Sequence, residues 1–95
     1  MTIMVLLKRQ APPEKSEELK VLIDQLRGAT FGQSGYISGE TLKRVDQPDE
    51  CLVIAKWKSR ADWQRWFDKP ERAAIQQKID DLLGTPTVYE IYEYE

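Results

Sequence analysis

A chain of 95 residues, 41% hydrophobic and 32% charged, has the composition of a globular protein, and its length predicts one domain over residues 1–95. A net charge of −2 argues against nucleic acid or anionic membrane as a partner, and no apolar run reaches the ~20 residues of a membrane span. With one cysteine, Cys51, and no histidine, the chain lacks a disulfide framework and the commonest ligand for zinc or haem. We expect a protein of the reducing cytoplasm, without metal or cofactor.

The first half of the chain predicts a strand, a helix and a loop. Residues 3–9 form an apolar run that ends in two basic residues, as a strand does. Apolar residues then recur at helical spacing between residues 14 and 27, which predicts an amphipathic helix that Gly28 can end. Residues 28–35 contain Gly, Ser and Gln and are predicted to be a loop.

The second half begins with a predicted hairpin. Residues 36–45 and 50–58 have the composition of strands, and the sequence Asp-Gln-Pro-Asp at 46–49 is typical of the turn between them. A capping-box pattern at residues 59–62, with Asp in place of Glu or Gln, predicts the start of a short aromatic helix.

A further helix and a last strand complete the pattern. Pro70 begins a helix with one apolar stripe, Gly84 can end it, and residues 87–94 form the last strand. The stripe consists of Ile75, Ile79, Leu82 and Leu83. The order β-α-β-β-α-β, with the second helical part broken in two, predicts a ferredoxin-like α+β fold: a four-stranded antiparallel sheet with helices on one face.

Two of the predicted strands are apolar on both faces. Residues 3–7 and 52–55 contain no polar side chain, whereas a sheet half open to water alternates apolar and polar residues. The helices can cover one face only, so a second copy of the chain is the simplest cover for the other. We therefore expect a homodimer; the alternative is a monomer with an exposed apolar face, which would tend to aggregate.

The hairpin register decides which side chains share a face. A four-residue turn would place Glu40 opposite Ala55 and Ser38 opposite Trp57. One face would then combine aromatic, hydroxyl, carboxylate and guanidinium groups, as small-molecule pockets often do. The predicted pocket residues are Tyr36, Ser38, Glu40, Arg44 and Trp57, joined by Trp66 from the short helix. A slip of one residue in the turn would destroy this grouping.

Glu40 and Arg44 are the candidate catalytic residues, because four residues apart in a strand they lie on the same face. Burial in an apolar cavity would raise the pKa of Glu40 and make it a general base, and Arg44 would stabilise a substrate anion. The alternative is a structural salt bridge between them at a sheet edge or dimer interface.

The three tryptophans could wall a cavity for a flat aromatic substrate, with their indole N–H groups as donors. The alternative is that they fill the junction between sheet and helix. Packing is favoured for Trp63, a pocket role for Trp66, and Trp57 is left open between the two.

Several segments carry a family resemblance. They are residues 35–40, the turn at 46–49, residues 52–59 with Trp57 two residues before the capping Ser59, and residues 88–92. In these segments the chain resembles the antibiotic biosynthesis monooxygenase (ABM) superfamily, over nearly its whole length. The resemblance implies a homodimeric α+β barrel. It also implies activities found in the superfamily, which include cofactor-free oxygenation of polycyclic phenols or quinols and cleavage of haem.

The chain departs from the haem-degrading branch of that superfamily. Trp57 matches a tryptophan of that branch. The branch also uses an asparagine and a histidine, but the corresponding regions of this chain, Leu6–Lys8 and Trp66–Phe67, contain neither residue. Haem degradation is therefore not expected. Many relatives also carry an acid two residues before the tryptophan, where this chain has Ala55.

Three functions remain open from the sequence. The first is a cofactor-independent monooxygenase that uses molecular oxygen on a small aromatic or quinol substrate in the sheet–helix cavity. The second is a non-catalytic dimeric binding or accessory protein of the same fold, which a cavity too small for a bicyclic ring would support. The third is an isomerase or decarboxylase acting on small ring compounds.

Overall fold

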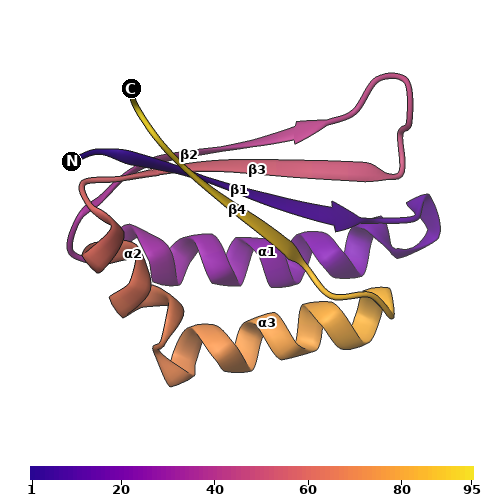
Figure 1. Cartoon of the computed structure of the whole chain (residues 1–95). Helices are drawn as coiled ribbons and strands as arrows, with labels where there is room; N and C mark the ends of the chain where they lie inside the picture. The colour runs from indigo at the N-terminus through magenta and orange to yellow at the C-terminus, as the bar shows by residue number, and fades with distance from the viewer.

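In a computed structural model that describes all 95 residues, four strands form one sheet and three helices lie against one of its faces (Figure 1). The strands are β1 (Ile3–Gln10), β2 (Tyr36–Lys43), β3 (Glu50–Trp57) and β4 (Val88–Glu93). The helices are α1 (Ser16–Phe31), α2 (Arg60–Phe67) and α3 (Pro70–Leu83), and a 3₁₀ turn (Pro13–Lys15) leads into α1. None of these helices combines the length and apolar character that crossing a bilayer requires.

The strand order is β2-β3-β1-β4, with all neighbours antiparallel. The predicted ferredoxin-like fold is therefore confirmed. β1 is a central strand: Ile3 pairs with Trp57 on one side and with Glu93 on the other. The two predicted helical segments after β3 are present as α2 and α3.

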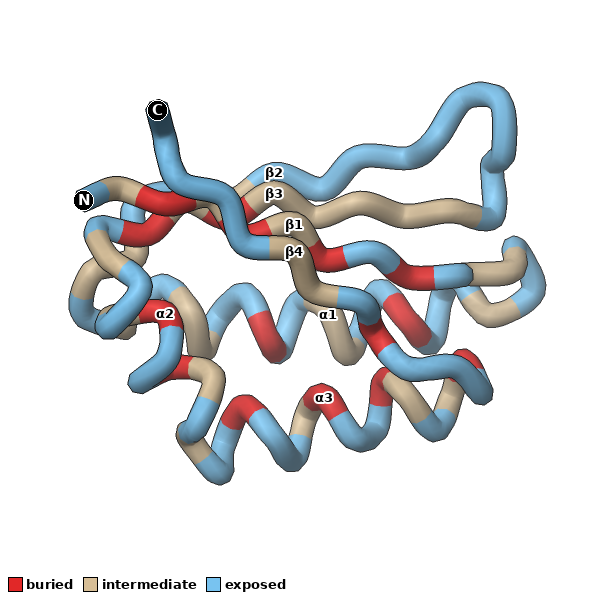
Figure 2. The backbone as a smooth tube through the Cα atoms, in the orientation of Figure 1, coloured by how far each residue is buried: buried red, intermediate tan, exposed pale blue.

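Alternation along β1 defines the buried face of the sheet. Ile3, Val5, Leu7 and Arg9 are buried, while the residues between them are half-buried or exposed. Figure 2 shows the same alternation along β1, and buried turns on the sides of α1 and α3 that face the sheet. The main core thus lies between the sheet and its helices, where β1 contributes every second residue and β3 contributes Ala55 and Trp57.

α2 and α3 begin and end as the sequence predicts. The Ser59 hydroxyl accepts a hydrogen bond from the Asp62 backbone N–H (3.1 Å), which satisfies one free donor of the first turn of α2. α3 ends at Gly84, whose φ of 72° is left-handed and whose N–H donates to the carbonyl of Asp80.

The prediction that Gly28 ends the first helix is wrong, because α1 continues to Phe31. A glycine inside a helix costs only about 1 kcal/mol relative to alanine, and the added turn gains hydrogen bonds. The Thr30 hydroxyl donates to the Leu26 carbonyl (2.6 Å), and the Gln33 side chain donates to the carbonyl of Ala29 (3.0 Å).

The predicted hairpin register is also wrong, by one residue. Glu40 pairs with Ile54 and Ser38 with Lys56, and a bulge follows Tyr36. The reason is the turn: Lys43 pairs with Cys51 and the Arg44 N–H donates to the Glu50 carbonyl, so five residues, 45–49, separate the last opposed pair instead of four. From Ser38 to Lys43, every residue of β2 thereby lies on the face opposite to the one predicted.

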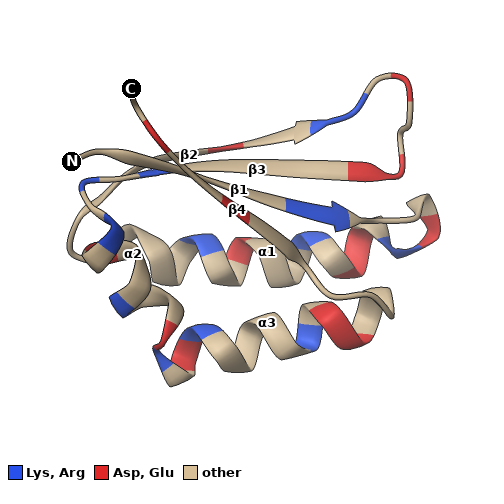
Figure 3. Ribbon diagram, in the orientation of Figure 1, with Lys and Arg blue, Asp and Glu red and all other residues tan.

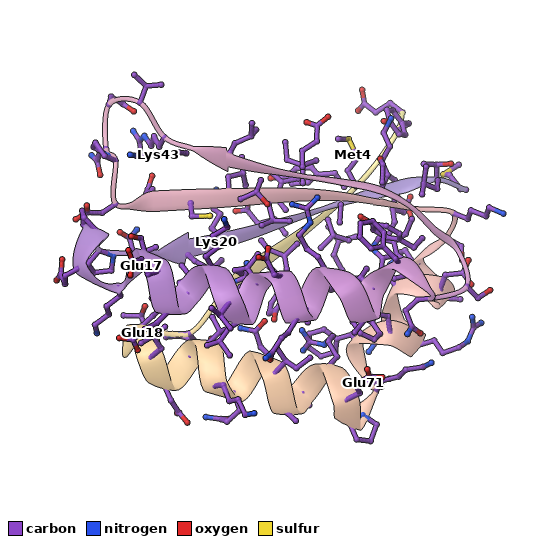
Figure 4. All side chains as sticks on the ribbon, turned by 180° about the vertical axis from the view of Figure 1, so that it is seen from behind. Met4, Glu17, Glu18, Lys20, Lys43 and Glu71 are labelled. Atoms are coloured by element: carbon purple, nitrogen blue, oxygen red, sulfur yellow. The ribbon has the colours of Figure 1, made fainter.

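The face of the sheet without helices is apolar at its centre. Met4, Leu6, Leu52 and Ile54 occupy adjacent positions on it, and all four are only half-buried. In Figure 4, Met4 lies on the side of the sheet away from the helices. The central strands β1 and β3 carry charged residues only towards their ends (Figure 3). We call this surface the open face.

Candidate functional site

A cavity of about 60 Å³ lies between the sheet and the helices. Its walls come from the first three strands, from α1 and α2, and from one residue of α3, Arg72. Most of this lining is apolar, for example Leu7, Val53 and Ala55 on the sheet and Leu26 on α1. The cavity is partly open to solvent.

All three tryptophans line this cavity. Trp57 is fully buried, and Trp63 and Trp66 are at most 4% exposed. Tyr36 and Trp57 meet edge to face with ring centroids 5.3 Å apart, and Trp57 meets Trp63 in the same way at 5.9 Å. Such contacts are worth about 0.5–1.5 kcal/mol beyond the buried area. Packing and cavity lining are thus not alternatives here, since each indole does both.

Tyr36 reaches the cavity over Gly39, which pairs with Ala55 on the neighbouring strand. A Cβ atom at Gly39 would overlap the Tyr36 hydroxyl, so the glycine provides the room that this ring occupies. Burial raises the pKa of Tyr36, which keeps its hydroxyl protonated and able to donate at neutral pH.

The indole N–H of Trp57 has no hydrogen-bond partner, and it is the only buried side-chain nitrogen or oxygen atom of which this is true. Leaving such a donor unsatisfied costs about 1–3 kcal/mol. Trp57 lines the cavity, but this N–H group is enclosed, so an acceptor oxygen of a ligand could reach it only if the surrounding side chains moved.

Two buried arginines also line the cavity, and neither was predicted from the sequence. Arg72 donates through Nε to the Phe67 carbonyl and through Nη1 to the Tyr89 hydroxyl, both at 3.0 Å. Its guanidinium also lies over the Phe67 ring, 4.3 Å from the centroid. Thus all of its protein partners are uncharged.

Arg9, the second arginine, is 3% exposed. It donates through Nε to the Thr87 hydroxyl (3.1 Å) and through Nη2 to the Gln76 side-chain oxygen (3.2 Å). Burial lowers the pKa of Arg9 from its usual value, because desolvation penalises the charged form. Asp80 binds both Gln76 and Thr87, so it reaches Arg9 only through these neutral groups.

Periodicity could have found both arginines. Arg9 continues the inward alternation of Ile3, Val5 and Leu7, and Arg72 stands four residues before Gln76 on the buried side of α3.

The structure separates the predicted site residues into two groups. Tyr36, Trp57 and Trp66 all line the cavity. Ser38 and Glu40 are exposed and belong to the open face, because their partners Lys56 and Ile54 alternate with the inward-facing Ala55 and Trp57. Glu40 borders the cavity but does not share a face with Trp57, so the predicted grouping of these two residues is wrong.

Arg44 lies at the turn end of the hairpin, away from the cavity-lining residues. It forms exposed ion pairs with Asp46 (2.7 Å) and Glu50 (2.6 Å), and the predicted pair with Glu40 is not formed. Hydrogen bonds from Arg44 lower the pKa of both carboxyl groups. This cluster is structural.

The chemistry available in the cavity is therefore hydrogen-bond donation and positive charge in an apolar enclosure. No cluster of three or more Cys, Asp or Glu side chains is positioned to hold a metal ion anywhere in the chain. The arrangement suits a flat, oxygen-bearing ring that the aromatic walls contact and the N–H groups orient.

Residues 2–78 match the family described as antibiotic biosynthesis monooxygenase. No curated protein matches the chain.

Among solved structures, a conserved protein from Methanosarcina mazei is similar over 100% of this chain and 94% of its own, with 22% identity and a TM-score of 0.91. A mutant of SnoaB, a cofactor-independent oxygenase from Streptomyces nogalater, is similar over 99% and 93%, with 12% identity and a TM-score of 0.86. Rv0793 from Mycobacterium tuberculosis is similar over 100% of this chain and 96% of its own, with 17% identity and a TM-score of 0.86. At these identities the likeness concerns the fold.

Proposed function

Because the chain belongs to the antibiotic biosynthesis monooxygenase family, we propose that it is a cofactor-independent monooxygenase that oxidises a small quinol-type aromatic in the sheet–helix cavity. The observation that carries this proposal is the apolar, aromatic-walled cavity, whose lining residue Trp57 has an enclosed indole N–H group without a protein partner. The likeness to SnoaB, a cofactor-independent oxygenase, supports it at the level of the fold.

The proposed reaction needs no external electron source. Loss of a proton from the quinol gives an anion with carbanion character on the ring, which adds O₂ to form a hydroperoxide. Loss of water from the hydroperoxide leaves a new carbonyl group, so a quinol and O₂ give a hydroxyquinone and water. One oxygen atom enters the product, the other becomes water, and the substrate supplies all the electrons.

The residues of the chain contribute positioning and electrostatics. The ring lies against Tyr36, Trp57 and Trp66, and the Trp57 N–H donates to the oxygen atom that carries the negative charge. The apolar walls exclude water from the anion. Glu40 is not assigned the role of general base, since its side chain belongs to the open face. The quinol instead ionises in solution, so turnover should rise with pH towards the phenol pKa of about 10.

Oxygen uptake with hydroquinone under ¹⁸O₂ tests the proposal. We expect one ¹⁸O atom in the hydroxyquinone product, and a loss of at least about tenfold in turnover for Trp57→Phe, about 1.4 kcal/mol in the barrier. Glu40→Gln should leave turnover unchanged. Uptake no faster than in buffer, or hydrogen peroxide equal to the oxygen consumed, would contradict a monooxygenase.

A second candidate is a dimeric binding or accessory protein without catalysis. The observation that favours it is the cavity volume of about 60 Å³, which is small beside the ~300–1,000 Å³ of common ligand pockets. Such a protein would bind a small ring without consuming oxygen. The same uptake experiment separates the two functions, and the volume limits either one to a substrate with few rings.

The open face supports a homodimer as the working form. Leu6 and Ile54 at its centre pair with each other across β1 and β3, and exposed Leu42 and Val88 extend the apolar surface to the edge strands. A second copy would bury this surface symmetrically, as in two sheets packed face to face. The single thiol, Cys51, suits a reducing cytoplasm, where we propose the protein acts.

A further inference from the structure

We infer that the ligand of the cavity carries a carboxylate group, which Arg72 binds with the support of Arg9. This inference rests on the proposed function in taking the cavity as the substrate site, and it narrows the substrate to an aromatic acid. Two buried guanidinium groups line one small cavity, and neither forms an ion pair within the protein.

Arg72 provides the stronger half of the argument. It is 5% exposed, and its protein partners are a carbonyl, a hydroxyl and an aromatic ring. No carboxylate lies within 4.0 Å, although the exposed Arg44 and Arg65 both have one. Buried charges are normally paired, because burying a lone charge is costly. An anionic ligand would supply the missing partner.

Arg9 adds a second positive charge to the same cavity. The charge of Arg72 further lowers the pKa of Arg9, beyond the main effect of burial, so the two guanidinium groups destabilise each other. Asp80 offsets part of this cost through Gln76 and Thr87, and it has no direct contact with Arg9. Bringing one negative charge between the arginines would relieve the repulsion.

Both arginines retain unused donors. Arg72 Nη2 and Arg9 Nη1 donate no hydrogen bond within the protein, and neither atom is fully enclosed. A guanidinium matches a planar carboxylate in geometry and charge, and such hydrogen bonds are about twice as strong as neutral ones. Arg27, exposed on α1, also lines the cavity and would attract an approaching anion.

The shape and lining of the cavity define the rest of the ligand. Aromatic walls fit a flat ring, and because the volume of about 60 Å³ is smaller than the ~150 Å³ of a cavity that holds benzene, a single ring would extend through the open side. A carboxylate is ionised at neutral pH, whereas a phenol is not, so it meets the charge requirement before any chemistry takes place. A hydroquinone that bears a carboxylate has all of these features.

The direct test compares two ligands that differ only in charge. Under nitrogen, calorimetric titration should show 2,5-dihydroxybenzoate binding the wild-type chain at least about tenfold more tightly than 2,5-dihydroxybenzamide, or ~1.4 kcal/mol. Equal affinities would overturn the inference, and so would a failure of the benzoate to bind. This comparison uses the unaltered protein, so it does not depend on the folding of a variant.

Variants locate the charge. Arg72→Met should abolish the preference for the benzoate and leave the affinity for the benzamide unchanged, whereas Arg72→Lys should retain part of the preference. Arg65→Met removes an exposed arginine from α2 and serves as the control. An Arg72→Met chain that stays folded by circular dichroism and keeps the full preference would overturn the role of Arg72.

Oxygen uptake measured in parallel separates this inference from the proposed function. If the charge preference is found without oxygen consumption, the carboxylate site stands and the oxygenase proposal fails. If the chain oxidises both 2,5-dihydroxybenzamide and 2,5-dihydroxybenzoate and binds them with equal affinity, the oxygenase proposal stands and the carboxylate site fails.

Discussion

The buried indole N–H of Trp57 combines a packing role with an unmet hydrogen bond. The ring fills the junction between the sheet and α2, and its contacts with Tyr36 and Trp63 hold it in place. The N–H group itself lowers stability in the ligand-free protein, because water no longer solvates it. This residue therefore stabilises the fold through its ring and weakens it through one atom.

We expect Trp57→Phe to change the free energy of unfolding by less than about 1 kcal/mol, since relief of the unsatisfied donor offsets the lost volume. Trp63→Phe removes a similar volume, but the N–H group that it removes is not a fully buried, unpartnered donor. Its free energy of unfolding should therefore fall by about 1–3 kcal/mol more than that of Trp57→Phe. Urea denaturation of the two variants measures the difference. Equal losses would contradict the assignment of an unsatisfied donor at Trp57.

At the level of elements, the entry to β2 and the start of α2 depend on each other. Gly35 precedes β2 with a φ of 86°, and its carbonyl accepts a hydrogen bond from the Lys58 N–H (2.8 Å). A Cβ atom at Gly35 would overlap the Asp62 side chain, which caps α2 with Ser59. Thus one glycine allows the hairpin and the short helix to meet.

Gly35→Ala should destabilise the protein by more than about 2 kcal/mol, because it carries two costs. A left-handed alanine is strained by about 1 kcal/mol, and its Cβ atom would also displace the Asp62 side chain from the cap of α2. Gly84→Ala is the matched control: its φ of 72° is also left-handed, but a Cβ atom there meets nothing within 4 Å. Thermal unfolding of both variants gives the comparison. If Gly84→Ala costs as much as Gly35→Ala, the overlap with Asp62 is not the cause.

The hairpin end should respond to acid. Arg44 lowers the pKa of Asp46 and of Glu50 below their ordinary values of 3.8 and 4.5. A lowered folded-state pKa gives stability that is present above the ordinary value and lost as the pH falls through the folded value. Arg44→Gln should therefore lose less stability than the wild type between about pH 6 and about pH 3, measured by urea midpoints. Lys43→Gln, which removes an exposed neighbouring charge, should follow the wild type.

Local patterns predicted most of the elements, and the errors came from quantities that such patterns do not contain. The caps at Ser59 and Gly84 and the strand periodicities depend on residues close in sequence, and they were confirmed. The hairpin register depends on the length of a turn, and here five residues between the last opposed pair replaced the expected four. That single difference moved Ser38 and Glu40 away from the candidate site.

The candidate site was half predictable for the same reason. Tyr36 and Trp57 were grouped through the expected register, and both line the cavity although that register is wrong, because the bulge after Tyr36 keeps this residue opposite Trp57. Trp66 was placed there from its position on the short helix, and it also lines the cavity. The buried states of Arg9 and Arg72 depend on partners far along the chain, such as Thr87 and Tyr89. Those contacts exist only in the folded molecule.

For the whole molecule, the open face predicts the oligomeric state. We expect sedimentation equilibrium to give twice the chain mass of 11.1 kDa, because the apolar centre of this face needs a cover. Ile54→Glu places a charge in that centre and should shift the protein to the monomer. Val21→Glu, on the exposed side of α1, introduces the same charge elsewhere and should leave the dimer intact. A monomeric wild type would contradict the proposal.

The central position of β1 has a consequence for how the chain folds during synthesis. This strand emerges from the ribosome first, yet Ile3 pairs with Trp57 and Glu93, so its neighbours on both sides arrive much later. At about 5–20 residues per second, an apolar segment waits several seconds for its first partner. Such non-local pairing also slows spontaneous refolding to roughly milliseconds to seconds. The part of the sheet made earliest is completed last, and during that interval it is the segment most exposed to chaperones and to aggregation.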